Sequence, residues 1–69
     1  LPKADYVYYA LASLNALTGD TEAALAHLRV AIRLRPQNRY QARNDADFKL
    51  LASDPRFCEL VYPERVVRA

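Results

Sequence analysis

Glycine, cysteine and tryptophan are scarce in this chain of 69 residues, which contains one glycine, one cysteine and no tryptophan. A single cysteine excludes an internal disulfide, and a single glycine excludes the glycine-rich loops that cradle phosphates. No apolar run approaches the ~20 residues of a transmembrane helix, and no basic-then-apolar signal segment opens the chain. We therefore expect no membrane span, and a cytoplasmic location is favoured.

An excess of charge of one sign is missing as well. Ten Lys and Arg residues face eight Asp and Glu residues, which gives a net charge of +2. This balance indicates neither a nucleic acid nor a membrane surface as a partner. Apolar residues make up 52% of the chain, too many for a disordered tail, and the abundance of Ala and Leu favours helices. The sequence predicts one all-α domain over residues 1–69, and the start at Leu1 suggests a piece of a longer protein or a processed form.

Two helices are predicted in the first half of the chain. In the first, one apolar row runs through Val7, Leu11 and Leu14, and Ala10, Leu14 and Leu17 form a second row beside it. Together the rows are wider than one core face requires, so this helix is expected to touch more than one neighbour. Gly19 is expected to end it, because glycine readily adopts the left-handed conformation that closes a helix.

The second helix is expected to begin at Asp20 or Thr21 and to stop before Pro36. Asp20 is placed to accept a hydrogen bond from the free N–H of Glu22 or Ala23. The core face of this helix repeats at helical spacing through Ala24, Leu25, Leu28, Ala31 and Ile32. Because about three residues join the two helices, they are predicted to pack antiparallel.

The pattern weakens after Pro36. Residues 38–46 are expected to form a short polar helix anchored by Tyr40, and Asp47 is a candidate cap for the cluster that follows. Asp54-Pro55 is a stronger helix start, with aspartate at the N-cap and proline at the first helical position. Pro63 should end this helix, and residues 63–69 are expected to be a fraying tail.

The spacing in the hairpin resembles that of the tetratricopeptide repeat (TPR) family, a unit of about 34 residues. The matching positions are Tyr8, Leu11, Ala12, Ala24, Leu28, Ala31 and Pro36. Asn15 stands where the family has tyrosine, and Leu28 where it has an aromatic residue. The resemblance implies one TPR hairpin over residues 5–38, of the right-handed α-α superhelix type, with Ala12 and Ala24 letting its helices approach closely.

A second repeat is not expected, because Ala42, Asp45 and Lys49 stand where it would need an aromatic residue, a leucine and a tyrosine. Residues 46–60 instead look like the closing segment that follows the last repeat of bacterial TPR proteins. Within residues 39–62, a cap is expected to pack on the second helix and to present a polar outer face. The packing residues would be Phe48, Leu50, Leu51, Phe57, Leu60 and Val61, and those facing water would be Asp45, Lys49, Asp54, Arg56 and Glu59.

Catalytic and metal chemistry have little support in the sequence. His27 has no converging ligands and is interpreted as a surface or boundary residue. Cys58 lacks a His–Asp or His–Asn pattern and is interpreted as a small buried hydrophobe. Asp45 and Asp47 stand where a turn and a cap would use them. The chain is therefore interpreted as a non-enzyme with no cofactor and no metal.

A partner protein or peptide is the favoured ligand, and two surfaces are candidates. The TPR resemblance implies that Tyr9 and Ser13, together with Tyr6, look into the groove where partner segments dock. The same tyrosines would equally well cover the flank where a preceding repeat packs, so self-association and upstream repeats of the same chain stay open. Amphipathic tyrosines suit an apolar peptide or a helix.

The alternative is a basic ridge that binds nucleic acid or an acidic partner. It consists of Arg29, Arg33, Arg35, Arg39 and Arg43, with no acidic residue between Glu22 and Asp45. Arg33 and Arg35 also fit a solvated helix end, where cations favour the helix dipole. Only Tyr40 is interleaved as a stacking aromatic residue. A protein-interaction module of scaffold or adaptor type is therefore preferred.

Overall fold

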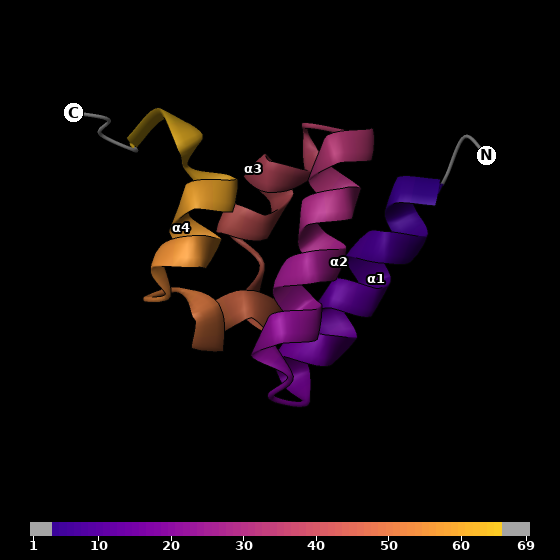
Figure 1. Ribbon diagram of the computed structural model, residues 1–69, viewed down its shortest axis with the longest axis vertical. Helices are drawn as coiled ribbons and strands as arrows, with labels where there is room; N and C mark the ends of the chain where they lie inside the picture. Colours follow the sequence, from indigo (N-terminus) through magenta and orange to yellow (C-terminus); the bar gives the residue numbers. More distant parts are fainter. Residues whose placement is uncertain (1–3, 66–69) are drawn as a thin grey trace.

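The computed structural model describes residues 4–65, and every regular element within this range is helical (Figure 1). The elements are α1 (Ala4–Leu17), α2 (Thr21–Leu34), α3 (Asn38–Arg43), the 3₁₀-helix η1 (Ala46–Leu51), α4 (Pro55–Val61) and the 3₁₀-helix η2 (Pro63–Arg65). The predicted all-α class is confirmed. The first part of the predicted tail forms η2, whereas residues 66–69 of that tail lie outside the described residues, as do residues 1–3.

The signals that were expected to begin and end the first two helices act as predicted. Gly19 has a φ of 85°, in the left-handed region that glycine adopts without strain. The Asp20 carboxylate accepts a hydrogen bond of 3.2 Å from the backbone N–H of Ala23 and so caps α2. Arg35 is extended, as expected of a residue before proline, and α2 ends at Leu34. Residues 18–20, which connect α1 to α2, reverse the direction of the chain.

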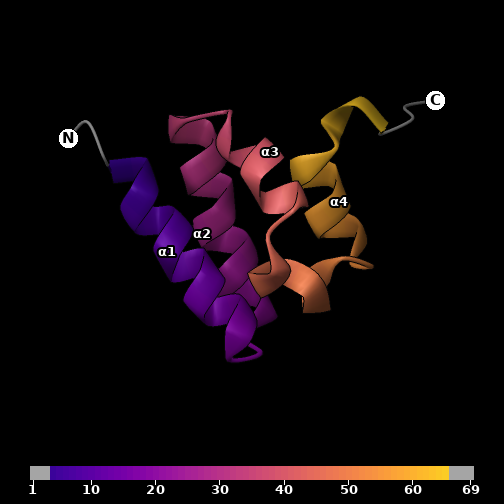
Figure 2. The ribbon, with the colours of Figure 1, turned by 180° about the vertical axis from the view of Figure 1, so that it is seen from behind.

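Helices α1 and α2 lie side by side in both views and meet through small residues (Figures 1 and 2). Ala12 of α1 and Ala24 of α2 are completely buried. Alanine side chains let two helix backbones approach more closely than leucines would, so the alanine row of α1 is the one that faces the interior. Its remaining core residues are Tyr9 and Ala16. The expectation that the wide apolar stripe of α1 faces the core is therefore wrong, because both of its rows, through Val7, Ala10, Leu11, Leu14 and Leu17, are exposed.

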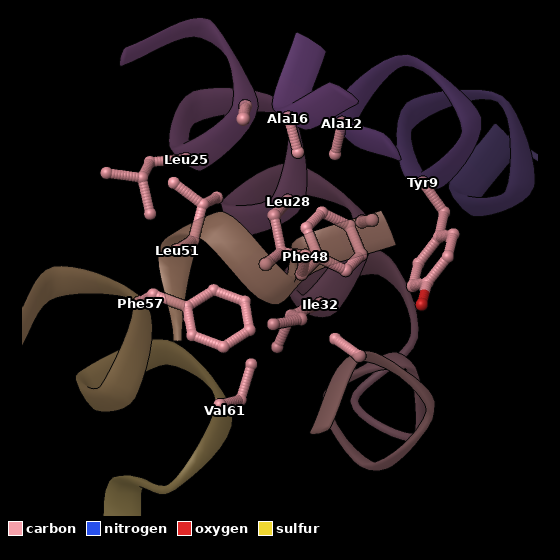
Figure 3. Packing of buried hydrophobic residues seen from close by; sticks show 13 residues of the cluster. Tyr9, Ala12, Ala16, Leu25, Leu28, Ile32, Phe48, Leu51, Phe57 and Val61 are labelled. Carbon is pink, nitrogen blue, oxygen red and sulfur yellow. The ribbon is translucent and has the colours of Figure 1, made fainter. Parts of the chain in front are cut away.

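The last third of the chain supplies both phenylalanines of the core (Figure 3). Phe48 of η1 meets the Tyr9 ring edge-on at 5.6 Å between centroids, and its centroid lies 5.7 Å from that of Phe57 in α4. Leu51 and Val61 complete the buried part of this segment. The cap predicted for residues 39–62 does cover the hairpin, but η1 packs on α1, whereas α3 and α4 contact α2.

Leu50 was expected in this core, and that expectation is wrong, because its side chain is 76% exposed. The reason is the period of η1, which has three residues per turn. Phe48 and Leu51 therefore share one face, and Leu50 points away from it. Asp47 was a candidate cap for this element, yet the cap is Asp45, whose Oδ1 accepts from the Asp47 N–H at 3.0 Å.

Helix α3 is short, as predicted, but Tyr40 is not its anchor, because that side chain is 55% exposed. The anchor is Asn38, whose buried amide nitrogen donates to Asp5 Oδ2 at 2.9 Å and to the Ala31 carbonyl at 3.0 Å. One side chain thus joins α1, the end of α2 and the start of α3. Asp54 begins α4 as expected, by accepting from the Arg56 N–H at 2.8 Å.

Candidate interaction surface

One side of α1 is apolar and exposed along most of its length. Val7, Leu14 and Leu17 each expose more than half of their surface, and Leu11 exposes more than a third. Val7, Leu11 and Leu14 follow one another at intervals of four and three residues, which places them in line on a helix. We call these four side chains, together with the exposed Ala10, the α1 face. It lies opposite the alanines that contact α2.

The α1 face carries no charge. No charged residue occurs between Tyr6 and Leu17, and the one acidic residue of α1, Asp5, is buried against Asn38. In Figures 1 and 2, α1 forms an outer edge of the fold, with the remaining elements on one side of it. The exposed side chains amount to roughly 500 Å², within the range of the largest apolar patches on monomeric proteins, which are often functional.

Tyr9 was expected to look into an open groove, and the structure corrects this. Its side chain is 7% exposed, packs against Phe48 and donates a hydrogen bond of 2.8 Å to Asp45 Oδ2. Burial and the neighbouring carboxylate both raise the pKa of the Tyr9 hydroxyl far above its ordinary value. Asp45, which was expected to face water, holds this contact. The C-terminal segment therefore occupies the position that a partner was expected to take.

The other two predicted contact residues lie away from the core. Tyr6 is 69% exposed and Ser13 is partly exposed. Tyr6 lies at the rim of a hollow of about 540 Å³ whose other lining residues are Asp5, Arg35, Gln37, Asn38 and Gln41. The three residues predicted to share a groove therefore differ in exposure, because Tyr6 and Ser13 are accessible and Tyr9 is buried.

The five arginines of the predicted basic ridge do not act as one group. Arg29, Arg33 and Arg35 are exposed on the outer side and at the end of α2. Arg39 and Arg43 instead donate through Nε to the carbonyls of Leu60 and Val61, the last two residues of α4. Those carbonyls have no partner inside a helix, so the two arginines satisfy the C-terminus of α4 from outside.

Arg43 also joins α3 to η2. Its guanidinium forms two hydrogen bonds with the carboxylate of Glu64, at 2.9 and 2.8 Å, and lies over the ring of Tyr62, 4.4 Å from the centroid. The Tyr40 ring lies 4.8 Å from the same guanidinium. Arg65 stacks on Tyr62 as well, at 4.0 Å. This part of the predicted ridge is engaged in contacts within the chain.

The remaining candidates form no cluster. The Nδ1 atom of His27 lies 2.7 Å from Asn15 Oδ1, at the boundary of the hairpin, and the Cys58 thiol is partly exposed and donates to the Ala52 carbonyl at 3.4 Å. Within residues 4–65, no three His, Cys, Asp or Glu residues lie close enough together to hold a metal ion. No helix of this range is long and apolar enough to cross a membrane.

Comparison of the chain with protein-family models, curated proteins and solved structures finds no match. The surface itself is therefore the basis for a functional proposal. Periodicity in the sequence already indicates that the apolar stripe of α1 is too wide for one neighbour. It does not indicate that both rows stay exposed, and the row through Val7, Leu11 and Leu14 is the main feature that the tyrosine-based prediction missed.

Proposed function

We propose that this chain is a non-catalytic helical interaction module that docks a partner through the α1 face. The main support is the continuous, uncharged apolar row of Val7, Leu11 and Leu14 on the outer side of α1. The opposite side of this helix is buried in the fold. Aliphatic surface of this kind gains free energy when it is covered, at about 25 cal/mol per Å² of apolar area removed from water. Recognition would be by shape and apolar contact.

The TPR resemblance fits this role. Two helices of 14 residues, a turn of three residues and contact through alanines are what a repeat hairpin requires, and the C-terminal segment covers one side of it. We propose that the chain is one TPR-like unit with its closing segment, open on the side of the α1 face. The predicted use of Tyr9 is abandoned, and Tyr6 and Ser13 become neighbours of the proposed surface.

The basic-ridge alternative has weaker support. Arg39 and Arg43 are held by α4 and Glu64, so phosphates would have to displace existing contacts. The exposed Arg29 and Arg33 lie on α2, the helix that also exposes Glu22. A charge pattern of this kind is common on solvated helices.

A library of displayed amphipathic helices tests the proposal. Peptides are selected on the unchanged chain, and their binding is then compared on L14K and L50K by fluorescence polarisation. Both leucines are exposed, so both variants should fold, and they differ in that only Leu14 lies on the α1 face. We expect selected peptides to lose at least tenfold in affinity for L14K and to keep it for L50K. Peptides that bind all three chains equally would contradict the proposal.

A further inference from the structure

We infer that the α1 face binds a second copy of this chain, face to face and antiparallel. The inference deepens the proposed function by naming the partner, and it depends on that function for the surface. Val7, Leu11 and Leu14 occupy the alternating four- and three-residue spacing of a helix–helix seam. Ala10 and Leu17 flank this seam on one side, and Tyr8 and Asn15 on the other.

The absence of charge on the α1 face favours a second copy of this chain as the partner. A surface that covers the α1 face must itself be free of charge, because burying an unpaired charged side chain is costly. The outer sides of the other long elements do not satisfy this: α2 exposes Glu22, Arg29 and Arg33, and α4 exposes Arg56 and Glu59. Of the two helices of 14 residues, α1 is the one whose outer side carries no charge, so a second α1 is a surface that matches. A surface that matches itself gives a closed, two-fold dimer.

The area of the face supports a dimer of modest strength. Two copies with about 500 Å² each would bury about 1,000 Å² in total, which is the lower limit for a specific protein interface. Such a dimer should dissociate on dilution and should not be an obligate assembly. The hairpin and its cap already form a buried core within one copy, so each protomer keeps its fold when the pair separates.

The antiparallel orientation follows from the helix dipoles. Two parallel α1 helices would place like ends side by side, whereas antiparallel helices place each N-terminus beside a C-terminus. In the antiparallel register that sets Val7 opposite Leu14 of the second copy, the two-fold axis passes between Ala10 and Leu11, so each Leu11 lies next to Leu11 of the second copy. Ala10 lies beside the axis, where its small side chain allows close approach.

Sedimentation equilibrium over a wide concentration range tests the dimer. The unchanged chain is expected to shift from a mass of 7.9 kDa towards twice that value as concentration rises. L14K should raise the dissociation constant at least tenfold, and L50K, a charge placed on an even more exposed leucine outside the face, should leave it unchanged. Circular dichroism should show that both variants remain helical. A monomer at all concentrations up to about 1 mM, or equal loss in both variants, would overturn the inference.

Disulfide trapping tests the orientation on chains in which Cys58 is replaced by Ser. L11C should cross-link readily under mild oxidation, because residue 11 meets its own copy. V7C and L14C should each cross-link poorly alone but should form a mixed disulfide when combined. Efficient cross-linking of V7C with itself would instead show a parallel pair and overturn the proposed arrangement. L50C is the control outside the face, and its cross-linking at the rate of L11C would indicate random collision.

The failures of the two proposals can be told apart. A chain that stays monomeric yet binds selected helices through Leu14 overturns the second copy as partner and supports the docking function. A chain that dimerises through Leu14 supports both. A monomer whose α1 face selects no helix overturns both.

Discussion

Replacement of Tyr9 by phenylalanine tests how the C-terminal segment is attached to the hairpin. The change removes one oxygen and with it the 2.8 Å hydrogen bond to Asp45 Oδ2, and it leaves the ring on Phe48. Hydrogen bonds to charged groups contribute about 1.5–3 kcal/mol, and this one is only partly buried. We expect Y9F to lower the free energy of unfolding by about 1–2 kcal/mol, or the melting temperature by roughly 5–10 °C for a domain of this size.

Urea unfolding followed by circular dichroism gives the magnitude, and a double-mutant cycle with D45A isolates the contact. Asp45 also caps η1, so D45A alone should cost more than Y9F. The coupling between the two changes should be about 1 kcal/mol. Y6F is the matched control, since Tyr6 is exposed, and should change stability by less than about 0.5 kcal/mol. A Y9F protein as stable as Y6F, or a coupling near zero, would refute the attachment through this bond.

Two further predictions concern the same core. The pKa of Tyr9 in the folded chain is raised above its ordinary value of 10.0, so the unfolded chain loses this proton first as pH rises, and the free energy of unfolding should fall above about pH 10. Urea midpoints measured across this pH range should fall less in Y9F than in the unchanged chain, and equal falls in the two proteins would contradict the prediction. A12L should lower the free energy of unfolding by about 1–3 kcal/mol, because a leucine at this position overpacks the contact between α1 and α2. A10L, at an exposed position of the same helix, should leave the thermal melt nearly unchanged. Equal effects of the two changes would place Ala12 outside the contact.

Local signals in the sequence predict the helix boundaries well, because each signal acts within a few residues. Gly19, Asp20, Pro36 and Asp54 all do what their chemistry indicates. The contacts that place the C-terminal third could not be predicted in the same way. The bond from Asn38 to Asp5 spans 33 residues and the bond from Tyr9 to Asp45 spans 36, and nothing near either residue indicates its partner.

The sequence predicts the candidate surface only in part. A wide apolar stripe on α1 is visible in the sequence, and hydrophobicity alone assigns it to the core. The structure instead exposes both of its rows and buries Ala12 and Ala16, which allow a closer helix contact than Val7 and Leu14. Leu50 was misplaced for a related reason: its prediction assumed an α-helical period in a segment that forms a 3₁₀-helix.

The three largest completely buried side chains are Phe48, Leu28 and Val61, and each belongs to a different element: η1, α2 and α4. If any of these elements detached, it would uncover one of the three, together with the surfaces that the other two pack against. Helices of six or seven residues are unstable in isolation, so η1 and α4 would not stay helical once detached. We therefore expect the chain to melt in one cooperative step, in which the hairpin and the closing segment are lost together.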